Sequence, residues 1–130
     1  MLSERFSLAV FDEYNLSYLQ PHFPGYPVFC FFAIIIYYIT NSLAISFSII
    51  ASISYLILIY FSNLLMDFKK GSISFYLLLL ILLLNPMLWI MSNRYMPDFM
   101  GLSIFVASFY LLSSEKTKDK YIGGFLFGVL

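Results

Sequence analysis

The sequence predicts an all-α, polytopic integral membrane protein, and two observations carry this prediction. First, 62% of the 130 residues are hydrophobic and only 11% are charged, whereas charged residues make up about a quarter of an ordinary soluble domain. Second, three long stretches contain no Asp, Glu, Lys or Arg: residues 14–66, 71–93 and 99–114. We expect about three full transmembrane helices, a juxtamembrane or re-entrant helix and a truncated last helix within a single membrane domain, residues 1–130.

The first two elements are predicted to stay on one side of the membrane. Residues 1–25 are too polar to span a bilayer and are expected to form an extracytoplasmic loop segment. Residues 26–40 are apolar and rich in Tyr and Phe, but these 15 residues reach only about 22 Å as a helix, against a hydrocarbon core of about 30 Å. Aromatic rings favour the headgroup boundary, so an interfacial or re-entrant helix is preferred to a complete crossing.

The later apolar stretches are the predicted transmembrane helices. Residues 43–66 reach about 36 Å, which suffices to cross with some tilt. Residues 73–91, with the run LLLLILLL, are expected to cross as one helix that accommodates Pro86 near its end. Residues 97–113 form a shorter span that must borrow flanking residues. Residues 121–130 begin a further apolar helix that stops early, from which we expect a piece of a longer polytopic chain.

The lysines set the expected orientation. They fall in two links that are separated by two crossings, and both links are therefore predicted to be cytoplasmic: Lys69, Lys70, Lys116, Lys118 and Lys120. The link at residues 92–98 is then extracytoplasmic, and it shares that side with residues 1–25 if the aromatic helix does not cross. A complete crossing by residues 26–40 would instead separate Asp12 from Asp98.

Asp12 and Glu13, in FDEY, are the first candidate site residues. A carboxylate among apolar residues, just ahead of a helix at the membrane, is partly desolvated, which suits a general base or a metal ligand. A solvated loop pair is the alternative, and the dipeptide alone favours it.

Arg94 and Asp98, in SNRYMPD, form the second candidate group. In one interpretation Arg94 reaches the headgroups and Asp98 caps the helix that follows Pro97. In the other, Arg94 holds a phosphate or diphosphate while Asp98 faces a cavity with Asp12. These residues alone leave both interpretations open.

Other residues narrow the choice of function. The single cysteine, Cys30, lies in an apolar run and is interpreted as a small buried hydrophobe. His22, in the Pro-rich PHFPGYP, is more readily a hydrogen-bonded loop residue than a metal ligand, since no second His exists. It is kept as a candidate substrate-binding residue. A net charge of zero leaves no general attraction to nucleic acid. Four serines of the first full span indicate close helix packing: Ser46, Ser48, Ser52 and Ser54.

The order of these pieces resembles the GT-C class of polytopic glycosyltransferases, particularly the protein O-mannosyltransferase and aminoarabinose-transferase-like group. In that family an acidic pair in the first extracytoplasmic loop precedes a Pro-rich stretch and juxtamembrane helices, as FDEY precedes HFPGYPVFCFF here. The segments NPMLWIMSNRYMPDFMGL and SSEKTKDKYIGGFLFGVL resemble the later helix, its link and the basic cytoplasmic loop. The resemblance covers the N-terminal part of the family, without the helix that normally precedes the acidic loop.

The resemblance implies transfer of a sugar from a polyprenyl phosphate to an acceptor on the extracytoplasmic face. Asp12 would act as general base or help to hold a divalent metal such as Mg²⁺ or Mn²⁺, with Glu13 beside it. Asp98 would line the cavity and share that metal, and Arg94 would counter the donor phosphate. Implied partners are membrane lipid, the lipid-linked sugar donor and the remainder of a split or longer chain, with no nucleic acid.

The expected location is the cell membrane, or the endoplasmic reticulum in a eukaryote. The alternative function is a non-catalytic small membrane protein, or a transporter fragment, whose charges only anchor helices. The enzyme hypothesis requires the carboxylates of Asp12 and Asp98 to converge within about 10 Å on one cavity.

Overall fold

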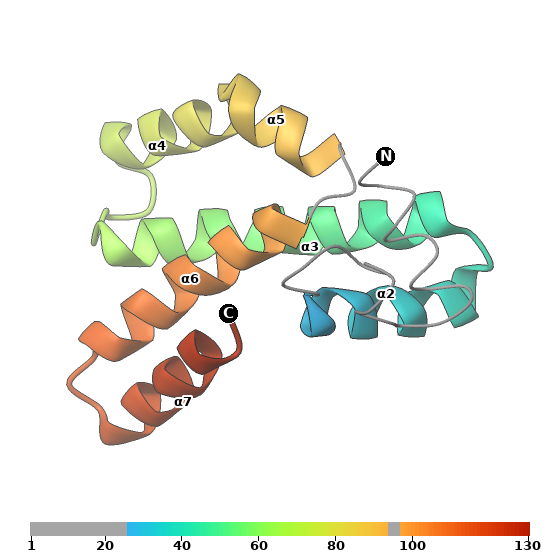
Figure 1. The fold of residues 1–130 in the computed structure, drawn as a ribbon. Helices are drawn as coiled ribbons and strands as arrows, with labels where there is room; N and C mark the ends of the chain where they lie inside the picture. The colour runs from blue at the N-terminus through green and yellow to red at the C-terminus, as the bar shows by residue number, and fades with distance from the viewer. Residues whose placement is uncertain (1–25, 94–96) are drawn as a thin grey trace.

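The computed structural model describes residues 26–93 and 97–130, and these ranges are entirely helical apart from short links. The predicted all-helical class is confirmed (Figure 1). The helices are α2 (Pro27–Thr40), α3 (Leu43–Leu65), α4 (Ile73–Leu84), α5 (Pro86–Asn93), α6 (Pro97–Ser113) and α7 (Thr117–Gly128). The long helix α3 is central: α2, the α4–α5 pair and α6 all pack against it.

A two-residue turn joins α2 to α3 and reverses the chain. Asn41 ends α2 in the left-handed conformation, with φ 51°, and its backbone N–H donates to the carbonyl of Tyr37. Asn tolerates this conformation better than most residues. Ser42 then begins α3 as its N-cap, accepting from the N–H of Ile45. The hydroxyls of Thr40 and Ser46 lie 3.0 Å apart across the turn.

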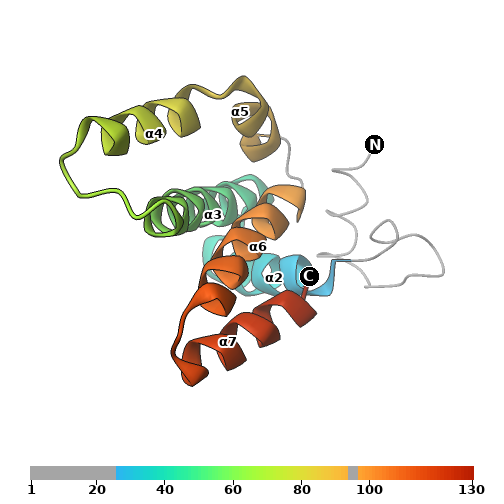
Figure 2. The same cartoon turned by 90° about the vertical axis from the view of Figure 1, so that its left-hand side faces the viewer.

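Two apolar clusters hold the helices together. In the first, Phe29, Cys30 and Ala33 of α2 pack on Phe47 and Ile50 of α3, and the rings of Phe29 and Phe47 stack with centroids 5.6 Å apart. This cluster fixes α2 alongside the first half of α3 (Figures 1 and 2).

The second cluster joins α3, α5 and α6 through Leu58, Leu88 and Phe99. The ring of Tyr55 lies 5.3 Å from that of Phe99. Because Tyr55 lies in the middle of α3 and Phe99 in the first turn of α6, this contact places the start of α6 against the middle of α3.

The predicted single helix over residues 73–91 is in fact two helices, α4 and α5, bent by 54° at Asn85. The residue before a proline is pushed out of the α region, and Asn85 is extended, with ψ 112°. Pro86 also has no N–H to offer the carbonyl of Leu82. That carbonyl accepts from the hydroxyl of Tyr55 on α3 instead.

Two further backbone groups at this break also have side-chain partners. The indole N–H of Trp89 donates to the carbonyl of Leu83 at 2.7 Å, and the Asn85 side chain accepts from the N–H of Met87 at 2.9 Å. A break repaired by side chains in this way suits surroundings that offer no water.

Helices α6 and α7 form a tight hairpin. A Cβ built on Gly123 would lie 2.9 Å from the backbone nitrogen of Leu112 and 3.0 Å from the carbonyl oxygen of Ser108. Only glycine permits the two backbones to approach so closely. Helix α7 begins at Thr117, ahead of the predicted start at residue 121, and Asp119 in its first turn complements the helix dipole.

The surface of the described helices is rich in large apolar side chains, which a water-soluble protein would mostly bury. The fully buried side chains include Ser46, Ser103 and Ser108, while large apolar side chains lie on the surface, with Tyr38 79% and Ile73 79% exposed. Buried small residues with apolar side chains outside are typical of helices packed in lipid.

One helix, α3, is long and apolar enough to cross a membrane. The α4–α5 pair also qualifies if its two helices count as one bent span. Helices α2 and α6 are apolar but shorter, and α6 with 17 residues falls below the length of a full span. The described residues therefore contain one or two candidate spans, against the three that the sequence predicts.

Candidate functional site

Among the predicted site residues, Asp98 lies in the part of the chain that the structure describes. Asp12, Glu13, His22 and Arg94 lie outside the described residues. The predicted convergence of Asp12 and Asp98 on one cavity therefore stays a prediction.

Asp98 occupies the first turn of α6, directly after Pro97. Pro97 suits the first helical position because its fixed φ matches the helix and its missing N–H would be unpaired there anyway. A carboxylate in the first turn is favoured by the helix dipole. The side chain of Asp98 is exposed, so it is available to a ligand as well as to the helix end.

The hydroxyl of Tyr26 donates to Oδ1 of Asp98 at 3.5 Å, and 72 positions separate the two residues in the sequence. Tyr26 caps the start of α2 and takes a left-handed conformation, with φ 40°. Burial, and then the charge and the hydrogen bond of Asp98, raise the pKa of the Tyr26 phenol above its ordinary value of 10.0. The phenol therefore stays protonated at neutral pH and remains a donor.

Tyr26 and Asp98 line a pocket of about 260 Å³ between the first turns of α2 and α6 and the last residues of the chain. The other lining residues include Phe29, Met100 and Leu130 and are mainly apolar. Leu130 packs close to Gly101 of α6. A Cβ added to Gly101 would lie 3.8 Å from the Cδ2 atom of Leu130. The Tyr26 phenol and the Asp98 carboxylate therefore lie in a largely apolar pocket.

A second cavity, of about 280 Å³, lies beside this pocket. Met100 and Ile104 of α6 line both the pocket and the second cavity, so the two spaces are neighbours along α6. The lining of the second cavity is almost wholly apolar, with Phe32 from α2, Ile53 from α3 and Leu126 from α7. The pocket at Tyr26 and Asp98 therefore supplies a small polar region next to an apolar cavity.

The described residues alone do not fit a divalent-cation site. Mg²⁺ and Mn²⁺ prefer several oxygen ligands, and within the described ranges no three His, Cys, Asp or Glu side chains gather in one place. Asp98 supplies a single carboxylate, and its described polar neighbour is a phenol. The predicted metal site shared by Asp12 and Asp98 stays a prediction.

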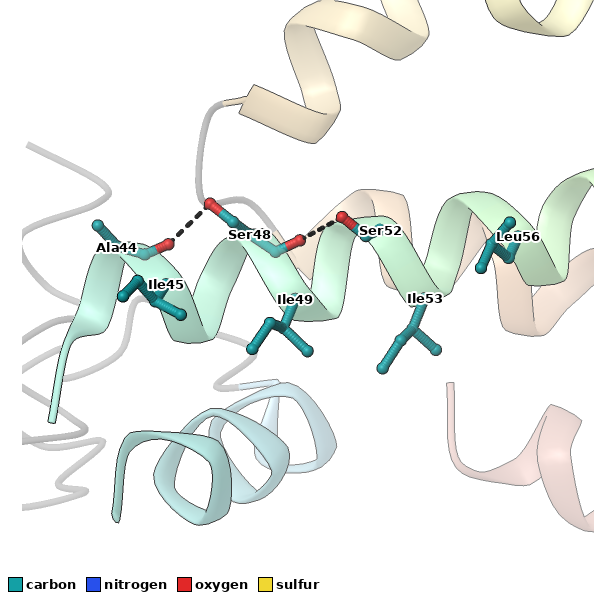
Figure 3. Close-up of a pocket in the computed structure, with 7 residues that line it drawn as sticks. All are labelled: Ala44, Ile45, Ser48, Ile49, Ser52, Ile53 and Leu56. Carbon is teal, nitrogen blue, oxygen red and sulfur yellow. Dashed lines mark hydrogen bonds between the residues drawn. The ribbon is translucent and has the colours of Figure 1, made fainter. Parts of the chain in front are cut away.

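The outward face of α3 carries a third hollow, which differs from the first two (Figure 3). Ser48 and Ser52 lie along it, and their hydroxyls donate to the carbonyls of Ala44 and Ser48 in the same helix, at 2.8 and 2.7 Å. The O–H donors of both serines are therefore used within the helix, and their oxygens remain as acceptors. Ser46 and Ser54 are buried on the packed face of α3, as predicted for close helix packing, whereas the same prediction is wrong for Ser48 and Ser52, which are exposed.

Tyr26 is the functional candidate that the sequence analysis missed, since it was counted only among the aromatic residues of 26–40. Its position before Pro27, which disfavours the helical conformation, is the local signal that it precedes the helix instead of continuing it. Its pairing with Asp98 has no signal in the sequence.

Comparison with protein-family models, curated proteins and solved structures finds no match to this chain.

Proposed function

We propose that this chain is part of a polytopic membrane glycosyltransferase of the GT-C type, which transfers a sugar from a polyprenyl-phosphate donor to an acceptor on the extracytoplasmic face. The pocket at Tyr26 and Asp98 is proposed as part of its substrate site. The observation that carries the proposal is the placement of this polar pair beside an apolar cavity, because a lipid-linked sugar has the same two-part chemistry.

The distribution of side chains supports the membrane setting of this proposal. Large apolar residues cover the outside of the described helices, and the broken backbone at Asn85 is satisfied by Tyr55, Trp89 and its own side chain. We infer that α3 crosses the bilayer once, that the bent α4–α5 pair crosses back, and that α6 crosses with help from flanking residues.

The short helix α2 supports the re-entrant form of the predicted juxtamembrane helix. It turns back at Asn41 and packs along the first half of α3, so its N-terminal end lies beside the first turn of α6, near the middle of α3 (Figure 1). In this arrangement residues 26–40 enter the outer half of the membrane and do not cross it. The residues before Tyr26 then stay on the side of Asn41.

The chemistry assigned to the site uses its polar groups in separate roles. Carboxylate oxygens accept hydrogen bonds from hydroxyls, so Asp98 suits a sugar or acceptor hydroxyl, and the Tyr26 phenol holds the carboxylate in place. In the transfer step the acceptor oxygen attacks the anomeric carbon and the bond from that carbon to the phosphate oxygen breaks. The phosphate leaves with the electron pair, and Asp12 is proposed to take the proton of the acceptor.

The alternative is a non-catalytic membrane protein or transporter fragment. One observation favours it: Asp98 sits in the first turn of α6 after Pro97, where capping and dipole effects alone account for an acidic residue. In that case the carboxylate contributes to helix stability, and its removal has no effect on any transfer reaction.

Sugar transfer by the complete gene product separates the two functions. Membranes that contain it are incubated with radiolabelled polyprenyl-phosphate sugars, and transfer to endogenous acceptors is measured for the wild type, Asp98→Asn and Asp12→Asn. Loss of a properly placed general base lowers the rate by about 10²–10⁴-fold, and loss of a substrate hydrogen bond lowers kcat/KM by about tenfold or more.

Asp67→Asn is the matched control. Asp67 is also an exposed aspartate, but it lies in the link after α3, away from the pocket. The proposal expects transfer by Asp67→Asn at the wild-type rate. Equal rates for all four proteins, or no transfer with any donor tested, would contradict it.

A further inference from the structure

The described charges are concentrated at one end of the molecule. In Figure 1 the link from α3 to α4 and the link from α6 to α7 both lie toward the same end of α3, and Figure 2 shows the two links apart from each other across that end. These links and the first turn of α7 carry all the lysines of the described ranges: Lys69, Lys70, Lys116, Lys118 and Lys120. We call these five residues the lysine end.

The lysine end is open and positively charged. All five lysines are exposed. They outnumber the acidic residues of the same links, which are Asp67, Glu115 and Asp119. Of these, Asp119 accepts a hydrogen bond from the hydroxyl of Ser114 at 2.7 Å, so one of its carboxylate oxygens is engaged within the link. A net positive charge is left facing away from the helices.

Exposed apolar and aromatic side chains lie directly beside these lysines. Ile73 is 79% exposed just after Lys70, and Tyr121 is 77% exposed just after Lys120. Tyr76, in the first turn of α4, is 61% exposed. Lysines bordering exposed tyrosines and isoleucines match the layer where lipid headgroups meet hydrocarbon, with the stems in the apolar layer and the amines among the phosphates.

We propose that the lysine end docks on the anionic phospholipid headgroups of the cytoplasmic leaflet. The two groups of lysines lie on separate links, so a flat charged surface engages both groups, whereas a compact soluble anion engages one. The apolar residues next to them place that surface at the edge of the hydrocarbon. This inference rests on α3 crossing the bilayer and does not depend on sugar transfer.

The expected effect is large enough to measure. A lysine close to an anionic membrane surface strengthens binding by about fivefold, and salt weakens this contribution because it screens the charges. The three carboxylates offset three of the five lysines. With about fivefold for each of the two remaining charges, we expect a preference of about 25-fold for an anionic over a zwitterionic lipid with the same acyl chains.

Lipid competition on the full chain tests this docking surface. The chain is purified in neutral detergent and mixed with equal amounts of phosphatidylglycerol and phosphatidylcholine, and native mass spectrometry then counts each lipid retained. The wild type is expected to retain about 25 times more phosphatidylglycerol than phosphatidylcholine at low salt, and the preference is expected to decline as salt is raised.

Two variants complete the experiment. Replacement of all five lysines by glutamine is expected to abolish the preference, and replacement of all five by arginine is expected to preserve it. A preference below twofold in the wild type, or a wild-type preference in the glutamine variant, would overturn the proposal. If far-UV circular dichroism shows that the glutamine variant has lost helix, the salt dependence of the wild-type preference is the deciding measurement. A wild-type preference that does not change with salt overturns the proposal. Asp98→Asn, which bears on the proposed transferase, is expected to leave the lipid preference unchanged.

Discussion

Substitution of Gly123 by alanine is expected to destabilise the protein by forcing α6 and α7 apart. The added Cβ would meet the backbone nitrogen of Leu112 at 2.9 Å, the Cβ of Leu111 at 3.0 Å and the carbonyl oxygen of Ser108 at 3.0 Å. Two of these atoms belong to the backbone of α6 and cannot rotate away. Overpacking of this kind costs about 1–3 kcal/mol of the free energy of unfolding.

Gly124→Ala is the matched control on the same helix. A Cβ at Gly124 meets nothing within 4 Å, so this variant keeps the packing and gains the better helix propensity of alanine, about 0.5–1 kcal/mol. Both variants share that gain in helix propensity, so they are expected to differ in free energy of unfolding by the overpacking cost of about 1–3 kcal/mol, with Gly123→Ala the less stable.

Unfolding in mixed micelles measures this difference. The full chain is titrated with sodium dodecyl sulfate in a neutral detergent, and the loss of helix is followed by far-UV circular dichroism. A Gly123→Ala variant as stable as Gly124→Ala would refute the close approach of α6 and α7.

Three further predictions concern the helix break, one link and the pocket. Tyr55→Phe removes the donor to the carbonyl of Leu82, and the same titration is expected to show a loss of about 1–3 kcal/mol; wild-type stability would contradict the repair of the break. Gly71→Ala places a Cβ at φ 84° and is expected to cost about 1 kcal/mol, whereas an unchanged transition would argue against that turn. Burial and then Asp98 raise the pKa of the Tyr26 phenol above 10.0. The contribution of the protonated phenol to the free energy of unfolding is therefore complete below pH 10.0 and is lost as the pH rises through the raised pKa. Asp98→Asn is expected to lower this pKa toward 10.0 without removing the effect of burial, and an unchanged pKa in nuclear magnetic resonance titration of labelled tyrosines would contradict the contact.

The helical class and the turn between α2 and α3 were accessible from the sequence because their signals are local. Charge-free apolar runs predict helices, and Ser42 stands just before the apolar run as a good N-cap. The placement of both lysine-bearing links at one end likewise agrees with the prediction of a common side, since two antiparallel passes of the chain separate them (Figure 1).

The bend at Asn85 was not predicted, because proline is tolerated inside membrane helices and the sequence does not show how its lost hydrogen bond is replaced. The replacement donor for Leu82 comes from Tyr55, which lies 27 positions away. The contact between Tyr26 and Asp98 spans 72 positions and depends on the packing of α2 and α6 against α3. Such pairings follow from tertiary structure and carry no local pattern.

The passage of α3 through the membrane is the central claim, and cysteine accessibility tests it most directly. Cys30 is 1% exposed, so Cys30→Ser provides a background for the single additions Asn41→Cys and Lys70→Cys at exposed positions before and after α3. In intact cells a membrane-impermeant maleimide is expected to label Asn41→Cys, and to label Lys70→Cys only after lysis. Labelling of both positions in intact cells would contradict the account.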